Sequence, residues 1–153
     1  MVYSSACEYA IRAATHLALH KDEDWVRLRD ISREEDIPAP FLSSILQRLV
    51  MSGLLRSARG PTGGYSLARP PEGISLHDIK AAIDGTAELD ECGVGLGKCS
   101  DDMPCPLHET WKPIRAQIKE YLRRTTLQDM AVALTAKREM LARSGQRPVV
   151  RRR

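Results

Sequence analysis

A glycine-rich segment between two short apolar runs is the feature that most constrains the fold of this chain. Residues 54–59 and 65–68 alternate apolar and polar side chains, and Gly60-Pro61-Thr62-Gly63-Gly64 separates the two runs. This pattern predicts a two-stranded antiparallel ribbon with a glycine-rich tip. Hairpins of this kind also occur in other small α/β domains, so the segments before the ribbon decide the fold class.

Three helices are expected ahead of the ribbon. Apolar residues spaced three and four apart predict helices over 4–20, 28–36 and 41–52. Pro40 suits the first turn of the third helix, and Gly53 suits its C-terminal end. Helix, helix, helix, ribbon is the order of a winged helix-turn-helix. We therefore expect a fold that is mainly α with one small β-ribbon.

The chain of 153 residues divides into four segments by pattern and charge. Residues 1–84 are predicted to form a winged helix-turn-helix domain that binds DNA and closes with a short helix over 75–84. Residues 85–105 are expected to form an acidic loop that carries three cysteines. Residues 106–143 are expected to form a long dimerisation helix and a C-terminal helical segment, and the basic tail 144–153 is expected to be disordered.

The predicted long helix carries apolar residues at steps of four and three, which is a heptad seam. Its members are Leu107, Trp111, Ile114, Ile118 and Tyr121, followed by Leu122. Such a seam packs either on its own domain or on a second copy of the chain. Because the helix is long and the rest of the protein is small, dimerisation is at least as favoured as internal packing.

A region without acidic residues coincides with part of the predicted helix-turn-helix and the ribbon. Residues 37–71 contain four arginines and no aspartate or glutamate, although the net charge of the chain is only +3. Positive charge on such a module favours double-stranded DNA as partner. A solvated surface charge is the alternative for each arginine, and it applies least to Arg59. The candidates for DNA contact are Ser43, Ser44, Gln47 and Arg48 on the third helix and Arg56, Arg59, Gly60 and Thr62 in the ribbon.

Three cysteines in the acidic loop indicate an inorganic centre. Cys92, Cys99 and Cys105 are separated by six and five residues, and His108 follows after two more. Thiolates are soft ligands for iron–sulfur clusters, zinc or copper(I), and this spacing differs from the paired C-x2-C knuckles of structural zinc sites. An iron–sulfur cluster (2Fe-2S or 4Fe-4S) is favoured. The alternatives are zinc in Cys3His form and a winged-helix repressor without a cluster. The fourth ligand would be His108, or Glu8 reached across the fold or from a dimer partner.

The sequence resembles the Rrf2 family of winged-helix regulators over about residues 1–135. The resemblance rests on Tyr9-Ala10, on the segment Arg59-Gly60-Pro61-Thr62-Gly63-Gly64-Tyr65, and on three cysteines before a long helix. It implies a homodimeric transcription factor whose cluster reports on iron–sulfur supply, oxidants or nitric oxide. By the same resemblance, Cys92, Cys99 and Cys105 correspond to the cluster thiolates. His108 matches a histidine ligand of the family, and Glu8 falls where other members use an acidic ligand.

Other classes of function find little support in the sequence. There is no C-x-x-C, no Ser/His/Asp pattern and no phosphate loop, so an enzyme is not expected. No apolar run reaches the roughly 18 residues of a membrane span, and the N-terminus is not a signal peptide. A cytoplasmic location is therefore expected. Because one helix-turn-helix reads few base pairs, we expect a homodimer on a palindromic operator.

Overall fold

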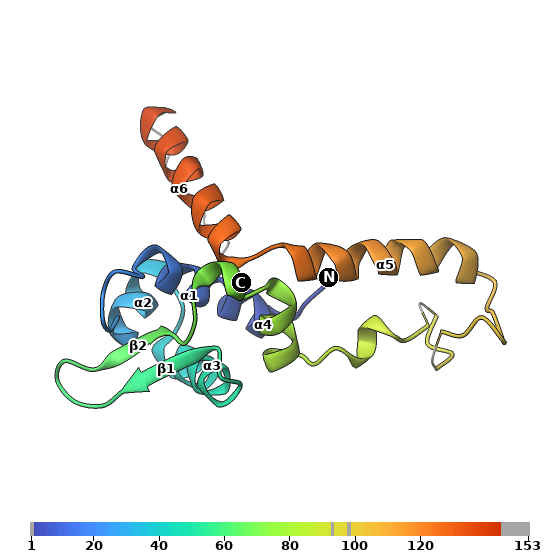
Figure 1. The fold of residues 1–153 in the computed structure, drawn as a ribbon, viewed down its shortest axis with the longest axis horizontal. Coiled ribbons are helices and arrows are strands. Elements are labelled where there is room, and N and C mark those ends of the chain that lie inside the picture. The colour runs from blue at the N-terminus through green and yellow to red at the C-terminus, as the bar shows by residue number, and fades with distance from the viewer. Residues whose placement is uncertain (1, 93, 98, 145–153) are drawn as a thin grey trace.

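The protein, analysed as a computed structural model, is described over residues 2–92, 94–97 and 99–144. Within these residues the chain forms α-helices, short 3-10 turns and one antiparallel pair of strands (Figure 1). The elements in order are α1 (Ser5–Leu19), α2 (Leu28–Glu35), α3 (Ala39–Met51), β1 (Leu55–Ala58), β2 (Gly64–Leu67), α4 (Leu76–Ile83), α5 (His108–Arg124) and α6 (Leu127–Ser144), with 3-10 turns at Pro71–Gly73 and Ala87–Leu89.

Helices α1, α2 and α3 pack their apolar stripes into one core. Ile31, Leu42, Leu46 and Leu49 are fully buried in it, and each such side chain contributes about 1.5–3 kcal/mol of transfer free energy. The three predicted helices are confirmed within two residues at each end. The third begins at Ala39 instead of residue 41, because proline is tolerated in the first helical turn.

The wing is the predicted ribbon, and its register runs from Leu55 opposite Leu67 to Ala58 opposite Gly64. Val26 extends it by exchanging backbone hydrogen bonds of 3.0 and 2.9 Å with Tyr65. This contact explains why residue 64 is a glycine, because a Cβ on Gly64 would lie 2.3 Å from the carbonyl oxygen of Val26. The strand therefore approaches a neighbouring backbone more closely than a side chain allows.

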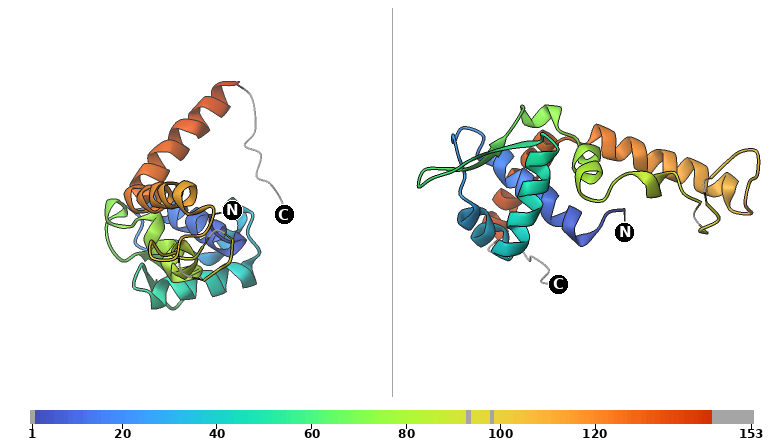
Figure 2. Two further views of the ribbon diagram at one scale, coloured as in Figure 1. Left: turned by 90° about the vertical axis from the view of Figure 1, so that its right-hand side faces the viewer. Right: turned by 90° about the horizontal axis from the view of Figure 1, so that it is seen from below.

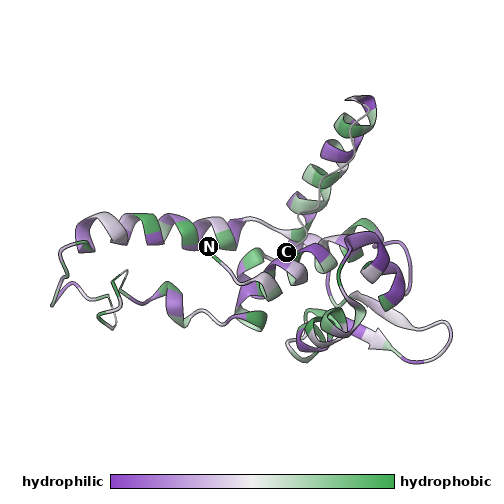
Figure 3. Cartoon of the chain, turned by 180° about the vertical axis from the view of Figure 1, so that it is seen from behind, coloured by the Kyte–Doolittle hydropathy of each residue, from purple (hydrophilic) through white to green (hydrophobic). Residues whose placement is uncertain are grey.

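The segment between α4 and α5 runs outward from this body, and helix α5 returns beside it (Figures 1 and 2). Apolar residues recur among hydrophilic ones along α5 (Figure 3). The predicted apolar residues of this helix differ in burial: Leu122 is fully buried, whereas Leu107, Ile114 and Tyr121 are each about half exposed. None of the described helices combines the length and apolar character needed to cross a bilayer.

Candidate functional site

A groove lies between the C-terminal half of α3, the start of α2 and the wing. It brings together three residues of the predicted DNA-contacting set, namely Gln47, Arg59 and Gly60. Its described lining holds three arginines and no acidic residue; the full set is Arg27, Leu28, Arg29, Gln47, Val50, Met51, Ser57, Ala58, Arg59, Gly60, Pro61, Gly63, Gly64 and Tyr65. Positive charge between a helix and a ribbon is suited to phosphate oxygens beside a DNA groove.

Arg27 and Arg29 are groove residues that the sequence analysis missed. Arg27 is the N-cap of α2, and the Arg29 side chain is 72% exposed. Aspartates and glutamates flank both residues in the sequence, so the region did not stand out as basic. The signal that could have identified them is their place in the first turn of the first helix of a helix-turn-helix, a helix that crosses the DNA backbone.

The other predicted DNA-contacting residues lie outside the lining of this groove. Ser44 and Thr62 are exposed and Ser43 is half-buried. The Arg48 guanidinium donates hydrogen bonds to the carbonyl oxygen of Ile83 and, at 3.4 Å, to that of Ala82. The structure thus engages Arg48 in joining α3 to the end of α4, and its part in DNA contact stays a prediction.

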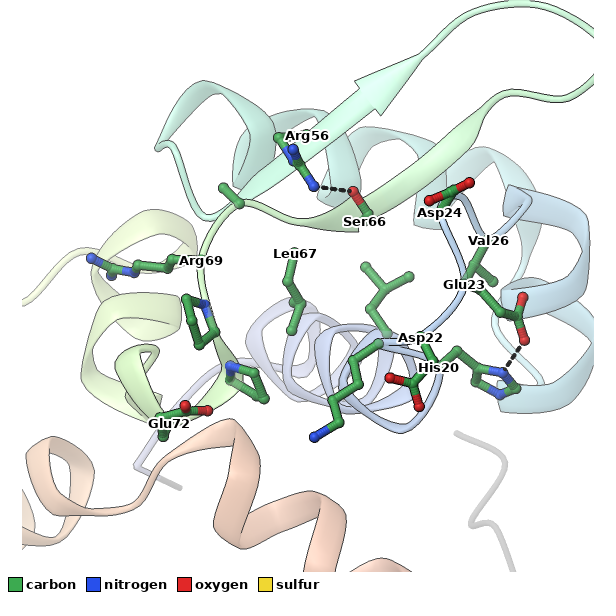
Figure 4. Close-up of a pocket in the computed structure, with 15 residues that line it drawn as sticks. His20, Asp22, Glu23, Asp24, Val26, Arg56, Ser66, Leu67, Arg69 and Glu72 are labelled. Atoms are coloured by element: carbon green, nitrogen blue, oxygen red, sulfur yellow. Dashed lines mark hydrogen bonds and ion pairs between the residues drawn. The ribbon is translucent and has the colours of Figure 1, made fainter.

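Arg56 faces a different pocket, beside the loop that follows α1 (Figure 4). Its guanidinium lies 5.8 Å from the centre of the Trp25 ring and donates to the Ser66 hydroxyl at 3.4 Å. Asp22, Glu23, Asp24 and Glu72 also line this pocket. Because acidic groups surround it, this pocket is a poorer match for phosphate than the groove between α3 and the wing.

The predicted cluster ligands come together as two pairs at the far end of α5. Cys92 Sγ lies 3.4 Å from Cys105 Sγ, and Cys99 Sγ lies 3.2 Å from His108 Nδ1. Backbone bonds shape the loop around them: Cys92 N–H donates to Gly97 O at 2.7 Å, and His108 N–H donates to Cys105 O at 2.9 Å. Four soft or borderline donors, from a loop and the first turn of a helix, thus form two close pairs.

The surroundings of the cysteines favour a thiolate at Cys92. Backbone N–H groups of Val94 and Leu96 hydrogen-bond its sulfur, and these bonds together with the bond from Cys105 lower the Cys92 pKa. The hydrogen bond to Cys92 raises the pKa of Cys105, so a proton is shared within this pair. A metal or cluster would displace that proton, because only the thiolate binds it.

His108 is oriented by a carboxylate on its other nitrogen. Asp101 Oδ1 lies 2.7 Å from His108 Nε2 and accepts a hydrogen bond from Lys112 Nζ at 2.6 Å. The hydrogen bonds from Lys112 and His108 lower the pKa of Asp101 and keep it anionic. A carboxylate on one imidazole nitrogen fixes the tautomer and directs the other nitrogen toward a metal. Here that other nitrogen is Nδ1, which faces Cys99.

Glu8, the alternative fourth ligand, lies in the first turn of α1. Among the described residues, the hydrogen bonds and ion pairs that hold the cysteine loop do not include Glu8. Within one chain the geometry therefore favours His108 over Glu8.

Comparison with known proteins places this arrangement in a family. The profile of the Rrf2 family, described as iron-dependent transcriptional regulators, matches residues 3–133. The chain belongs to the Rrf2 family. The expected winged-helix fold and family membership are thereby confirmed. Because the Rrf2 family and its named relatives are transcriptional regulators, the expectation of a non-enzymatic role is confirmed as well.

Individual Rrf2 relatives match most of the chain. The HTH-type transcriptional regulator IscR of Vibrio cholerae is 32% identical over 130 residues, which cover 85% of this chain and 75% of that protein. The structure of CymR, the global cysteine regulator of B. subtilis, superposes with a TM-score of 0.75 at 28% identity, covering 85% of this chain and 95% of CymR. IscR of T. potens gives a TM-score of 0.68 at 28% identity, with 86% of each chain covered.

Proposed function

We propose that this Rrf2 regulator is a homodimer that binds a palindromic operator and carries an iron–sulfur cluster whose state alters operator binding. The observation that carries the proposal is the pairing of Cys92 with Cys105 and of Cys99 with His108 near the start of α5. The cluster would make operator binding respond to redox state, nitric oxide or iron–sulfur supply. Such a regulator would act in the cytoplasm.

The donor set fits an iron–sulfur cluster in number and kind. Each iron of a 2Fe-2S centre takes two protein ligands, and in some such centres histidine replaces cysteine on one iron. The pairs Cys92 with Cys105 and Cys99 with His108 match that requirement more closely than a 4Fe-4S centre, which commonly takes four cysteines. When bound, such a cluster supplies an electron-accepting centre that oxidants and nitric oxide can attack.

Zinc bound by the same Cys3His set is the second candidate. The observation that favours it is the bond from Asp101 to His108, since carboxylate–histidine pairs are common around zinc. A zinc site would give a colourless protein, whereas an iron–sulfur cluster absorbs visible light.

Dimerisation through α5 is supported by the exposed part of its seam. Leu107, Ile114 and Tyr121 are 49%, 49% and 50% exposed, although they occupy heptad positions. A second copy of α5 packed in a coiled-coil manner would cover them. Two winged helices held in this way would read two half-sites of a palindrome.

Specific contacts link the cysteine loop to α3, the helix that carries predicted DNA contacts. Glu88 accepts a hydrogen bond from the fully buried Lys80 of α4, and Asp90 accepts one from Lys119 of α5. Arg48 of α3 in turn holds the end of α4. Rearrangement of the loop would therefore act on α4 and α5 together, and through α4 on the position of α3. The result would be a population shift between two dimer geometries.

Purification without oxygen tests the proposal directly. We expect a coloured protein containing iron and sulfide, and we expect Cys99→Ala to lose the visible absorbance. Cys7→Ala is the matched control, because Cys7 is buried in the body and should leave the colour unchanged. Operator binding of the intact protein should change on oxidation or nitric oxide exposure. Colourless protein that contains zinc would favour the second candidate, and protein that regulates normally with neither metal would refute both.

A further inference from the structure

A second group of metal-binding side chains lies within the winged-helix domain, on elements other than the cysteine loop. His16 lies in the last turn of α1, His20 is the C-cap of that helix, and Glu34 lies on α2. Each offers one ligand atom, and the three atoms lie within 4.8 Å of one another. The two imidazole rings stack with their centroids 4.5 Å apart, and Glu34 Oε2 lies 4.0 Å from His16 Nδ1.

Each histidine of this group is held by a carboxylate. His20 Nδ1 lies 2.8 Å from Glu23 Oε1 (Figure 4), and His16 Nδ1 lies 3.1 Å from Glu35 Oε1. Such pairing orients an imidazole and raises its basicity as a ligand.

A pocket gives access to the group from solvent. Its lining includes His16, His20 and Glu34 together with Glu23 and Asp30. The His16 side chain is only 1% exposed, whereas those of His20 and Glu34 are 31% and 43% exposed. Ligand atoms around a tetrahedral zinc ion lie about 3.3 Å apart, given Zn–N distances near 2.0 Å. The ligand atoms here lie within 4.8 Å of one another. Because the His20 and Glu34 side chains are partly exposed, they can move toward the buried His16 and reach the spacing that zinc requires.

We propose that His16, His20 and Glu34 bind a divalent transition-metal ion of the zinc class, which cross-links α1 to α2. Two imidazoles and one carboxylate suit zinc with a water molecule in the fourth position. Calcium and magnesium are excluded as preferred ions because they take oxygen ligands. This proposal is independent of the cysteine loop and of operator binding. The site would place a metal beside Arg27, which lines both this pocket and the groove between α3 and the wing.

Cobalt(II) titration of the full-length, metal-free protein tests the site. Cys92, Cys99 and Cys105 are first replaced by serine, so that thiolates do not compete for the ion. We expect one equivalent of Co2+ to bind with weak d–d absorption and no sulfur-to-metal charge-transfer band. His20→Gln should weaken this binding at least tenfold. His77→Gln, which removes a histidine of α4 outside the group, should leave it unchanged, and Mg2+ should not compete.

Thermal unfolding supplies a second readout that does not depend on colour. Zn2+ should raise the melting temperature of the serine-substituted parent and of His77→Gln, but not that of His20→Gln. If the serine-substituted chain does not fold, the intact chain should bind two equivalents of Co2+, only one of them with charge-transfer bands. Two results would contradict the proposal. Either the intact chain binds no Co2+ beyond the equivalent at the cysteine site, or His20→Gln and its parent bind Co2+ with equal affinity. These side chains would then form only a polar network.

Discussion

Arg59 is the single residue for which we most expect a contact with DNA. It lines the groove beside Gly60, whose φ of 105° bends the start of the wing tip. Among the described residues, no carboxylate forms an ion pair with it, so its charge is available to a ligand. The Arg56 guanidinium, by contrast, lies against Trp25 on another surface.

Replacing Arg59 by alanine should therefore weaken operator binding. We expect a loss of about 1–3 kcal/mol if the side chain reads a base or a narrow minor groove. Fluorescence anisotropy with a labelled operator at fixed salt measures it. Arg56→Ala is the matched control and should cost less. Unchanged affinity in Arg59→Ala would remove this residue from the interface.

Gly64 is a residue whose small size the fold requires. A Cβ there would meet the carbonyl oxygen of Val26 at 2.3 Å, which is far inside contact distance. We expect Gly64→Ala to lower the free energy of unfolding by about 1–3 kcal/mol, as overpacking does. Chemical denaturation measures it. Gly73→Ala is the control, because its nearest neighbour would be 3.9 Å away; equal losses in both variants would contradict this reading.

At the scale of elements, α5 carries an apolar stripe that we propose as half of a dimer interface. Its inner end contributes Leu122 to the core, while Ile114 and Tyr121 stay about half exposed and lie outside the core cluster of the described chain. A charge placed on that stripe would be buried in a dimer but solvated in a monomer. Dimerisation and folding of the chain can therefore be tested separately.

Ile114→Glu should shift the protein toward monomers. Analytical ultracentrifugation should show dimerisation weakened by about 2 kcal/mol or more if the residue lies near the centre of the interface. Ala116→Glu adds the same charge to the opposite face of α5 and should leave the mass of the dimer observed by ultracentrifugation unchanged. A dimer that persists in Ile114→Glu would place the interface elsewhere.

A buried ionic cluster joins three helices. Glu35 of α2 lies 3.1 Å from His16 and 3.6 Å from Arg12, both of α1, and 3.8 Å from Arg138 of α6. These contacts lower its pKa in the folded state despite burial. A carboxylate of this kind stabilises the fold above its unfolded pKa, and that contribution is lost as the pH falls through the folded pKa.

Acid should accordingly destabilise the parent protein more steeply than a Glu35→Gln variant. We expect the difference in unfolding free energy between the two to be largest near neutral pH and to shrink below about pH 4, where the unfolded carboxyl is protonated. Urea unfolding at a series of pH values measures it. A difference that is independent of pH would mean that the ionised form of Glu35 contributes nothing to stability.

At the scale of the whole molecule, the cysteine loop and the DNA groove are far apart in the sequence but connected through α4. Lys80 of α4 holds the loop at Glu88, and Arg48 of α3 holds the last carbonyls of α4. Under the proposed function, Arg48 would transmit the state of the loop, whereas Arg59 would only contact the operator.

Arg48→Gln should reduce the ratio between the operator affinities of the cluster-loaded and cluster-free protein. Arg59→Ala should lower both affinities equally and leave the ratio unchanged. Anisotropy titrations of both forms of each variant measure the two ratios. If Arg48→Gln also lowered both affinities equally, Arg48 would be a DNA contact, as the sequence pattern alone predicted.

The sequence alone determined the elements of this protein and the chemistry of its loop. Apolar spacing, prolines and the glycines of the wing specify local structure through short-range sterics and burial, so the helices and the ribbon were predicted nearly to the residue. Likewise, three cysteines and a histidine in one segment indicate an inorganic centre through the ligand chemistry of thiolates, and that centre stays a prediction.

Only the tertiary structure decided which side chains meet. Arg27 and Arg29 join the groove because α2 lies against the wing, and Arg48 turns to α4 because the end of that helix presents free carbonyls. His16, His20 and Glu34 converge because α1 packs on α2. Contacts between elements depend on how helices cross and which rotamers fit, and a one-dimensional pattern carries neither.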